Sequence, residues 1–393
     1  MTDLFAPLQS LKQGNWFKLI CGASFQHLPA VRSLTLAYTL AGADCIDVAA
    51  DPAVIAAAQA ALQVARDLAR DAQERGFGYK GNSPFLMVSL NDGEDPHFRK
   101  AEFNSTECPT DCPRPCERIC PAQAIVFNRI KDEFSGVVSQ KCYGCGRCIP
   151  VCPYDIIYTS SYMSTPGAIA PLVMSTGIDA VEIHTKVGRL EEFQRLWQAI
   201  SPWTDQLKLI AISCPDGEGM TDYLHAIYEL ITPLKCALIW QTDGRPMSGD
   251  IGDGTTLAAV KLGQKVLAAK LPGYVQLAGG TNSYTVAKLK AIGLLNSAEF
   301  RVMSAEKDSI TQDLRRGKHA ATANRTQHYI AGVAYGSYAR VLLSPILDQL
   351  ENKEVSNTSI KATVRLEEDE VLLWQAVELA HSLVSPLKSQ QER

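Results

Sequence analysis

Four cysteines near the middle of the chain have a spacing that strongly limits what this region can fold into. Cys142, Cys145, Cys148 and Cys152 follow the pattern Cys-x2-Cys-x2-Cys-x3-Cys, and Pro153 comes next. This pattern is typical of bacterial ferredoxins that carry two iron–sulfur clusters. Three closely spaced thiolates can hold three corners of one cubane, while the fourth, turned away by the proline, reaches the other cubane. The spacing therefore predicts a ferredoxin-type module.

A second cysteine group lies upstream and supplies the remaining ligands. Its members are separated by three residues throughout and are Cys108, Cys112, Cys116 and Cys120. If ligands cross over as in ferredoxins, the two predicted ligand sets are Cys108, Cys112, Cys116 and Cys152 for one cluster, and Cys120, Cys142, Cys145 and Cys148 for the other. Zinc is the alternative, because two Cys-x2-Cys pairs can form a tetrahedral site, but the long run and the second group favour iron–sulfur.

The irregular spacing of the upstream group places Asp111 where a second cysteine is expected, three residues after Cys108. A carboxylate is a hard ligand where a soft thiolate normally binds, so iron at this corner would be held weakly. We then expect oxidation to convert this 4Fe-4S cluster to a 3Fe-4S form. In the other interpretation, a proline-stiffened loop delivers Cys112 by a longer path, and the sequence leaves both open.

The composition is that of a large folded protein. The 393 residues are 46% hydrophobic and 20% charged, which is enough for one large core and a small insertion. Twelve cysteines could form disulfides, but the chain begins without a secretory pattern and eight of them lie in the two groups. The net charge of −4 and the lack of a long basic run argue against nucleic acid as a partner. Without an apolar run long enough to span a membrane, we expect a cytoplasmic protein.

Outside the cysteine groups, short apolar runs alternate with longer amphipathic stretches, which indicates repeated βα units. The eight predicted strands are residues 17–23, 45–50, 85–90, 180–185, 208–213, 236–241, 274–278 and 328–334. The helices predicted between and after them are residues 30–40, 52–75, 166–177, 190–200, 220–231, 256–270, 284–292, 338–349 and 367–387. Eight strands favour an α/β fold of the (β/α)8 TIM-like barrel type, and an open doubly wound sheet is the alternative.

The cysteine groups fall after the third strand, so we predict a discontinuous barrel. Residues 1–92 and 164–393 would form the barrel, and residues 93–163 would form an inserted two-cluster ferredoxin-like module. A loop after a barrel strand emerges at the C-terminal face, where ligand sites of such barrels lie. We therefore expect the clusters at or beside the mouth of the barrel.

Residues at the ends of the predicted strands are candidates for a ligand pocket at this mouth. The strongest of them are Asn91, His184, Cys214, Gln241, Asp243 and Arg245, and Ser24, Asp51 and Asp216 lie on the same rim. The last two strand ends are rich in glycine, and in barrels such loops often bind phosphate. The candidate phosphate-binding residues are Gly279, Gly280, Thr281, Gly336 and Ser337. A flavin is one possible occupant, although these glycines could equally serve tight turns.

The chain resembles the cyanobacterial light-dependent period (LdpA) family over nearly its whole length. The segments that carry the resemblance are the two cysteine groups, WFKLICGAS at 16–24, DCIDVAADP at 44–52 and IWQTDG at 239–244. Residues 45–52 and 241–244 also resemble a plastid-encoded barrel family of unassigned activity that lacks the clusters. Both resemblances together imply that barrel with a ferredoxin module inserted.

The resemblance to the LdpA family implies an iron–sulfur protein that reports cellular redox state from photosynthetic electron flow and the quinone pool. The partners that it implies are a clock-input histidine kinase and the oscillator proteins. Quinone or a redox protein is a further candidate partner. No catalytic reaction accompanies the resemblance, so a redox sensor is favoured over an enzyme. The alternative is a barrel oxidoreductase, in which the clusters pass electrons to a flavin or a phosphate-bearing substrate at the barrel mouth.

Overall fold

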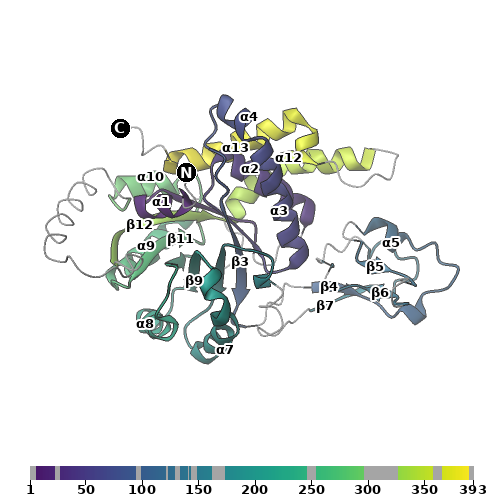
Figure 1. The fold of residues 1–393 in the computed structure, drawn as a ribbon, viewed down its shortest axis with the longest axis horizontal. Helices are drawn as coiled ribbons and strands as arrows, with labels where there is room; N and C mark the ends of the chain where they lie inside the picture. Colours follow the sequence, from purple (N-terminus) through teal and green to yellow (C-terminus); the bar gives the residue numbers. More distant parts are fainter. Residues whose placement is uncertain are drawn as a thin grey trace.

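Eight parallel strands close into a barrel in the computed structural model, and helices surround it (Figure 1). The structure describes residues 6–22, 27–93, 99–120, 123–128, 133–139, 141–142, 148–161, 173–245, 254–295, 326–356 and 365–388. The barrel strands are β1 (Trp16–Ile20), β2 (Cys45–Ala49), β3 (Phe85–Asn91), β8 (Ala180–His184), β9 (Leu209–Pro215), β10 (Ala237–Asp243), β11 (Gly273–Ala278) and β12 (Thr326–Tyr335). Because β1 pairs with both β2 and β12, the sheet has no edge and the open doubly wound sheet is excluded. The predicted (β/α)8 barrel is confirmed.

The helices follow the strands much as the alternating pattern predicts. They are α1 (Ala6–Gln13), α2 (Leu28–Ala41), α3 (Pro52–Asp67), α4 (Ala69–Glu74), α7 (Leu190–Ile200), α8 (Met220–Ile231), α9 (Thr255–Ala268), α10 (Thr285–Ala291), α12 (Ser337–Ser356) and α13 (Glu370–Lys388). The helix predicted at 52–75 is divided at Leu68, whose angles of φ −91° and ψ 4° leave the helical region. The helix predicted at 166–177 lies largely outside the described residues.

Local sequence signals fix the end of α2 and the start of α3, the helices before and after β2 in the sequence. Asp51 is the N-cap of α3, and its carboxylate accepts hydrogen bonds from the amides of Ala53 and Val54. Pro52 occupies the first helical turn, where its fixed φ is favourable. The preceding helix, α2, ends at Gly42, which adopts a φ of 101° that suits glycine. The N-cap therefore fixes Asp51 just beyond the C-terminal end of β2.

The interior of the barrel is apolar at the N-terminal end of the strands. The buried residues that form this part of the core are Leu11, Trp16, Cys45, Phe85, Met87, Ala180, Leu209, Ala211, Ala237, Ile239, Tyr274 and Ala331. Leu11 belongs to α1, so this helix covers the N-terminal end of the barrel. A larger apolar core lies between the outer face of the barrel and its helices. At the opposite, C-terminal end, the strand-end residues Asn91, His184 and Asp243 are partly exposed.

A group of short elements lies between β3 and β8 in the sequence and to one side of the barrel, beyond α3 (Figure 1). Its elements are β4 (Arg99–Glu102), the 3-10 helix η1 (Ser105–Glu107), α5 (Pro115–Ile119), β5 (Ile125–Val126), β6 (Gly136–Val137) and β7 (Tyr158–Ser161). β4 pairs antiparallel with β7, and β5 with β6. We call this group the cysteine insertion. Its ferredoxin-like character and its limits at residues 93 and 163 stay predictions.

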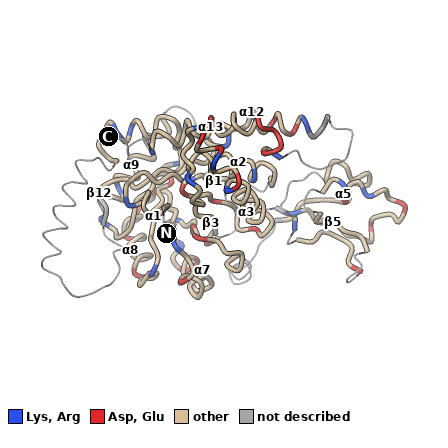
Figure 2. Tube along the Cα trace, turned by 45° about the horizontal axis from the view of Figure 1, so that its top comes forward, with Lys and Arg blue, Asp and Glu red and all other residues tan. Residues whose placement is uncertain are grey.

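The described surface carries charges of both signs. Figure 2 shows lysine and arginine interspersed with aspartate and glutamate along the helices of the barrel. Within the described ranges, no helix is both long and apolar enough to cross a membrane.

A bidentate ion pair ties the C-terminal segment to the barrel. Both Nη atoms of Arg32 on α2 donate to the Glu367 carboxylate, in a 3-10 turn just before α13. Burial acts to raise the pKa of Glu367, but the hydrogen bonds and charge of Arg32 lower it below its ordinary value. This contribution to stability is therefore present above the unfolded pKa of about 4.3, and it is lost as the pH falls through the lower folded pKa.

We expect Glu367→Gln to reduce the free energy of unfolding by about 1–2 kcal/mol at neutral pH, because a partly buried charge-assisted pair is lost. The difference from the unsubstituted protein should shrink as the pH falls below the unfolded pKa of about 4.3. Urea unfolding across this pH range provides the measurement. Glu370→Gln is the matched control, since the pair of Glu370 with Arg75 is exposed and should contribute nothing measurable. An equal loss in both variants would contradict the assignment.

Candidate functional site

Four cysteines of the insertion lie together, three from the first cysteine group and one from the second. Burial raises the pKa of Cys108. The nearby thiols of Cys112 and Cys152 raise it further. Cys116, at the start of α5, is in turn influenced by the other three thiols. These four residues are the set that the crossed ferredoxin arrangement assigns to one cluster. The fold of the insertion therefore brings a residue from the second cysteine group to three from the first.

The second predicted set is described only in part, because Cys145 lies outside the described residues. Cys142 and Cys148 are buried in the small core of the insertion, and Cys120 packs against that core. Two of these sulfurs accept backbone hydrogen bonds, Cys142 Sγ from Ala101 N at 3.4 Å and Cys120 Sγ from Ala124 N at 3.2 Å. In the first set, Cys112 Sγ likewise accepts from Arg114 N at 3.4 Å. Amide donors to sulfur are a feature of iron–sulfur sites.

The chemistry of these thiols fits a bound iron–sulfur group. Burial raises the pKa of Cys116 to about 11, so its thiolate needs a compensating cation to form at neutral pH. Among the described residues, no three histidine, cysteine or acidic side chains converge as the ligands of a single metal ion do. Thiolates around a cubane bind separate iron atoms and need not converge on one point. Asp111 is exposed, whereas Cys112 is buried with its neighbours, and the ligand role of Asp111 stays a prediction.

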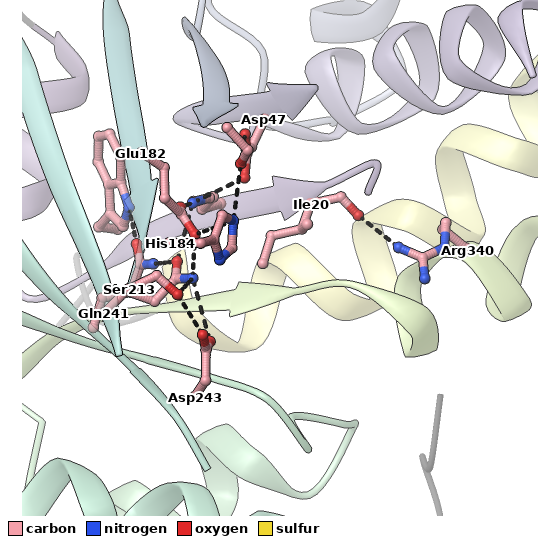
Figure 3. A network of polar contacts seen from close by, with 12 residues as sticks. Ile20, Asp47, Glu182, His184, Ser213, Gln241, Asp243 and Arg340 are labelled. Atoms are coloured by element: carbon pink, nitrogen blue, oxygen red, sulfur yellow. Dashed lines mark hydrogen bonds and ion pairs between the residues drawn. The ribbon is translucent and has the colours of Figure 1, made fainter. Parts of the chain in front are cut away.

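A second concentration of polar side chains fills the barrel above its apolar layer (Figure 3). We call it the interior network, and its members are Lys18, Asp47, Ser89, Glu182, His184, Ser213, Gln241, Asp243 and Gln276. They come from seven of the eight barrel strands, because inward positions recur every second residue. The network therefore occupies the end of the barrel where ligand sites of this fold lie.

The ammonium group of Lys18 is the centre of the interior network. It contacts Glu182 Oε2, it lies 3.1 Å from Asp47 Oδ2, and it donates to Gln241 Oε1 at 3.0 Å. The amide of Gln241 donates in turn to Glu182 Oε1 at 2.5 Å and accepts from Gln276 Nε2 at 2.6 Å. Lys18 and Glu182 are completely buried. Burial raises the pKa of Asp47, and the charge of Lys18 opposes this effect.

His184 and Asp243 lie at the outer edge of the network, at the ends of β8 and β10. His184 Nε2 is 3.2 Å from Glu182 Oε1 and 3.3 Å from Ser89 Oγ. Asp243 accepts from Ser213 Oγ and, at 3.3 Å, from Gln241 Nε2. Ser213 connects the two, because it is also the register partner of His184. The structure therefore brings together three of the predicted pocket residues, His184, Gln241 and Asp243.

The other predicted rim residues have different surroundings. Asn91 ends β3 and is the register partner of His184, so it belongs to the same edge. Cys214 instead packs in the outer core, because its neighbour Ser213 faces inward and side chains alternate along a strand. Arg245 is exposed, and Asp216 forms an exposed ion pair with Lys265. Ser24 lies outside the described residues.

The glycine-rich loops after β11 and β12 are closely packed. A Cβ atom on Gly279 would lie 2.8 Å from the Arg245 carbonyl oxygen, and Gly279 has a φ of 59°. Gly280 likewise approaches the backbone of Thr255. Ser337 begins α12, and its hydroxyl accepts from Arg340 Nη2 at 3.1 Å. Contact between loops accounts for Gly279 and Gly280, and a phosphate site in these loops stays a prediction.

Sequence reasoning missed the three central charges of the interior network. Lys18, Asp47 and Glu182 each lie in the middle of a short apolar strand, in WFKLI, CIDVA and AVEIH. A single charge at an inward position of a buried strand is rare unless it has a partner. Opposite charges in the centres of three separate strands were thus the signal that could have found the network.

An ion pair connects the cysteine insertion to the barrel. Lys100 on β4 is 4% exposed, and its ammonium lies 3.1 Å from Asp51 Oδ2 at the end of β2. The same ammonium donates to the carbonyl oxygen of Ser139, three residues before Cys142. The next residue after Lys100 is Ala101, whose amide donates to Cys142 Sγ. Lys100 therefore lies between a candidate cluster ligand and the N-cap of α3.

Known proteins match both parts of the chain. Residues 172–386 match the family model of the light dependent period A C-terminal domain, and residues 108–163 match that of the LdpA Fe-S cluster-binding domain. The protein Light dependent period A of Synechococcus elongatus is 46% identical over 382 residues. The match covers 97% of this chain and 94% of that protein.

We expect Lys18→Met to reduce the free energy of unfolding by about 3–5 kcal/mol at neutral pH, since it leaves two buried carboxylates without their cation. The loss should shrink as the pH falls, because the carboxyls can then bind protons. Chemical denaturation followed by circular dichroism measures both effects. Lys208→Met is the control, because Lys208 is partly exposed at the N-terminal end of the barrel. Unchanged stability of Lys18→Met would contradict the ionic network.

Proposed function

The chain belongs to the light dependent period A family, and from this premise we propose that it is a redox sensor that relays the state of photosynthetic electron flow and the quinone pool to the circadian clock. Its cofactor is iron–sulfur, as the matching cluster-binding domain indicates. We further propose two 4Fe-4S clusters, a cytoplasmic location, and contacts with a clock-input histidine kinase and oscillator proteins. The observation that carries the proposal is the grouping of Cys152 with Cys108, Cys112 and Cys116.

This grouping supports two clusters because it follows the crossed ligand pattern. A single cluster served by Cys142, Cys145, Cys148 and Cys152 would keep Cys152 with its sequence neighbours. Instead, Cys152 lies with the upstream thiols Cys108, Cys112 and Cys116. In a two-cluster ferredoxin, each cysteine run gives its last residue to the other cluster.

A sensor also needs a path from the cofactor to a surface that changes. When bound, a cluster supplies reversible one-electron chemistry and differs by one unit of charge between its two states. The Ala101 amide, hydrogen-bonded to Cys142 Sγ, and the neighbouring Lys100 ammonium would respond to that charge. Lys100 is paired with Asp51, which caps α3, so we propose that the first turn of α3 changes its stability with redox state.

Anaerobically purified protein should contain about eight iron and about eight acid-labile sulfide atoms per chain, as two cubanes require. Cys116→Ser should lower both contents to about half, because one ligand set is incomplete. Cys236→Ser is the matched control, since Cys236 is a buried cysteine of the barrel's outer core and should leave the contents unchanged. Zinc in place of iron and sulfide would contradict the assignment. Stoichiometric flavin in the same preparation would favour the oxidoreductase alternative.

The path through Lys100 predicts a redox difference at the start of α3. Hydrogen exchange of the Ala53 and Val54 amides, which the Asp51 carboxylate binds at 2.8 and 3.4 Å, should differ several-fold between oxidised and reduced protein. Lys100→Met should abolish the difference while the iron content is retained. Asp51→Asn is a second variant, because asparagine preserves the N-cap but removes the ion pair.

Lys208→Met should keep the redox difference, since its ion pair with Asp179 lies at the other end of the barrel. If the Lys100 and Asp51 variants showed the same redox dependence as the unsubstituted protein, this path would be wrong. The iron–sulfur assignment itself would then stand on the metal content alone.

A further inference from the structure

The charges of the interior network do not cancel. Its positive charge is the Lys18 ammonium, which donates to Glu182 and Gln241 and lies 3.1 Å from Asp47 Oδ2. The third carboxylate, Asp243, is held only by the neutral donors Ser213 and Gln241 among the described residues. In the described network, three carboxylates therefore surround one lysine. The surplus negative charge lies at the outer edge, where Asp243 is partly exposed.

His184 does not supply the missing positive charge. Its Nε2 faces the Glu182 carboxylate at 3.2 Å, and that carboxylate already binds the lysine and the Gln241 amide. Nε2 must then carry the proton, which leaves the lone pair of the ring on Nδ1. Burial, followed by the charge of Lys18, lowers the pKa of His184 to about 3, so the ring is neutral at physiological pH.

The Nδ1 atom of His184 is therefore an acceptor at the open end of the barrel. No described residue donates a hydrogen bond to it, and the His184 side chain is 19% exposed. Ser213 links His184 to Asp243, because Ser213 pairs in register with His184 and donates to the Asp243 carboxylate. Two strand ends thus present a neutral acceptor and a carboxylate on either side of one serine.

Asp47 provides an independent sign that the network contains an unfilled hydrogen-bond acceptor. Its Oδ2 atom is buried and accepts no aligned hydrogen bond within the described part of the chain, although Lys18 Nζ is 3.1 Å away. Buried polar atoms of this kind are uncommon and often mark a place for water, an ion or a ligand. Structural need alone does not explain the network, because apolar residues would fill the same space at least as stably.

We propose that the open end of the barrel binds a small organic cation, whose protonated amine is held by the Asp243 carboxylate and His184 Nδ1. An ammonium group matches these acceptors in both charge and hydrogen-bonding capacity. It also neutralises the surplus charge of the network. An anionic ligand would meet the carboxylates of Asp243, Asp47 and Glu182 with only one lysine in opposition, and that lysine already binds Glu182 and Gln241. This site is separate from the cysteine insertion and does not depend on the proposed sensor function.

The test uses the full chain with its clusters loaded, and 1,4-diaminobutane as the probe. Anaerobic calorimetric titration should show saturable binding of one diamine per chain. The size-matched neutral 1,4-butanediol and anionic succinate should show none. Binding of succinate as tightly as the diamine, or the absence of saturable diamine binding, would overturn the proposal. Unchanged cluster absorbance during the titration keeps this result separate from the iron–sulfur assignment.

Substitutions locate the site. Asp243→Asn should weaken diamine binding at least tenfold, because it removes the charge but keeps the shape. His184→Gln should weaken it by a similar factor, and this variant decides the matter if Asp243→Asn fails to fold. Asp216→Asn is the matched control, because it removes an exposed carboxylate after β9 that pairs with Lys265. If Asp243→Asn and His184→Gln both bound the diamine as tightly as the unsubstituted protein, the amine would bind elsewhere and the assignment would be refuted.

Discussion

The buried ammonium of Lys18 is the interaction on which the interior of the barrel depends. It lies on β1 and contacts side chains of β2, β8 and β10, so one cation joins four strands of the barrel. Removing an ion from water costs several kcal/mol, and only well-placed partners offset that cost. Asp47, Glu182 and Gln241 must therefore keep their positions, and with them the strand ends that carry His184 and Asp243.

The layers of side chains inside the barrel also decide which of its two ends can bind a ligand. The N-terminal end is filled with apolar side chains and covered by Leu11 of α1. The polar network begins one layer higher and reaches the partly exposed rim. The cysteine insertion leaves the barrel from the C-terminal end of β3, which is the same rim. A parallel barrel gathers all its βα loops at this end, so the insertion and the open end of the network are neighbours by topology.

The periodicity of apolar residues and the spacing of the cysteines made much of this arrangement predictable. Apolar runs located all eight strands, and the spacing of Cys142 to Cys152 indicated the cofactor that the family match supports. The same treatment failed for Lys18, Asp47 and Glu182, because a run scored by its average hydrophobicity conceals one charge at its centre. It also placed Cys214 at the mouth, although alternation with Ser213 turns it to the outer core. Contacts between residues distant in sequence, such as Lys100 with Asp51, leave no local pattern to find.

The strand β2 brings the two centres into one short segment. Asp47, a partner of Lys18, lies within the strand, and Asp51, the partner of Lys100, lies four residues later as the N-cap of α3. The backbone between them is held by hydrogen bonds, from Cys21 N to Asp47 O at 2.9 Å and from Asp51 N to Ala49 O at 2.8 Å. Both lysines are almost completely buried, so moving either carboxylate would weaken the pairing of a buried cation. Displacement of Asp51 by the insertion would therefore act on the same strand that positions the interior network.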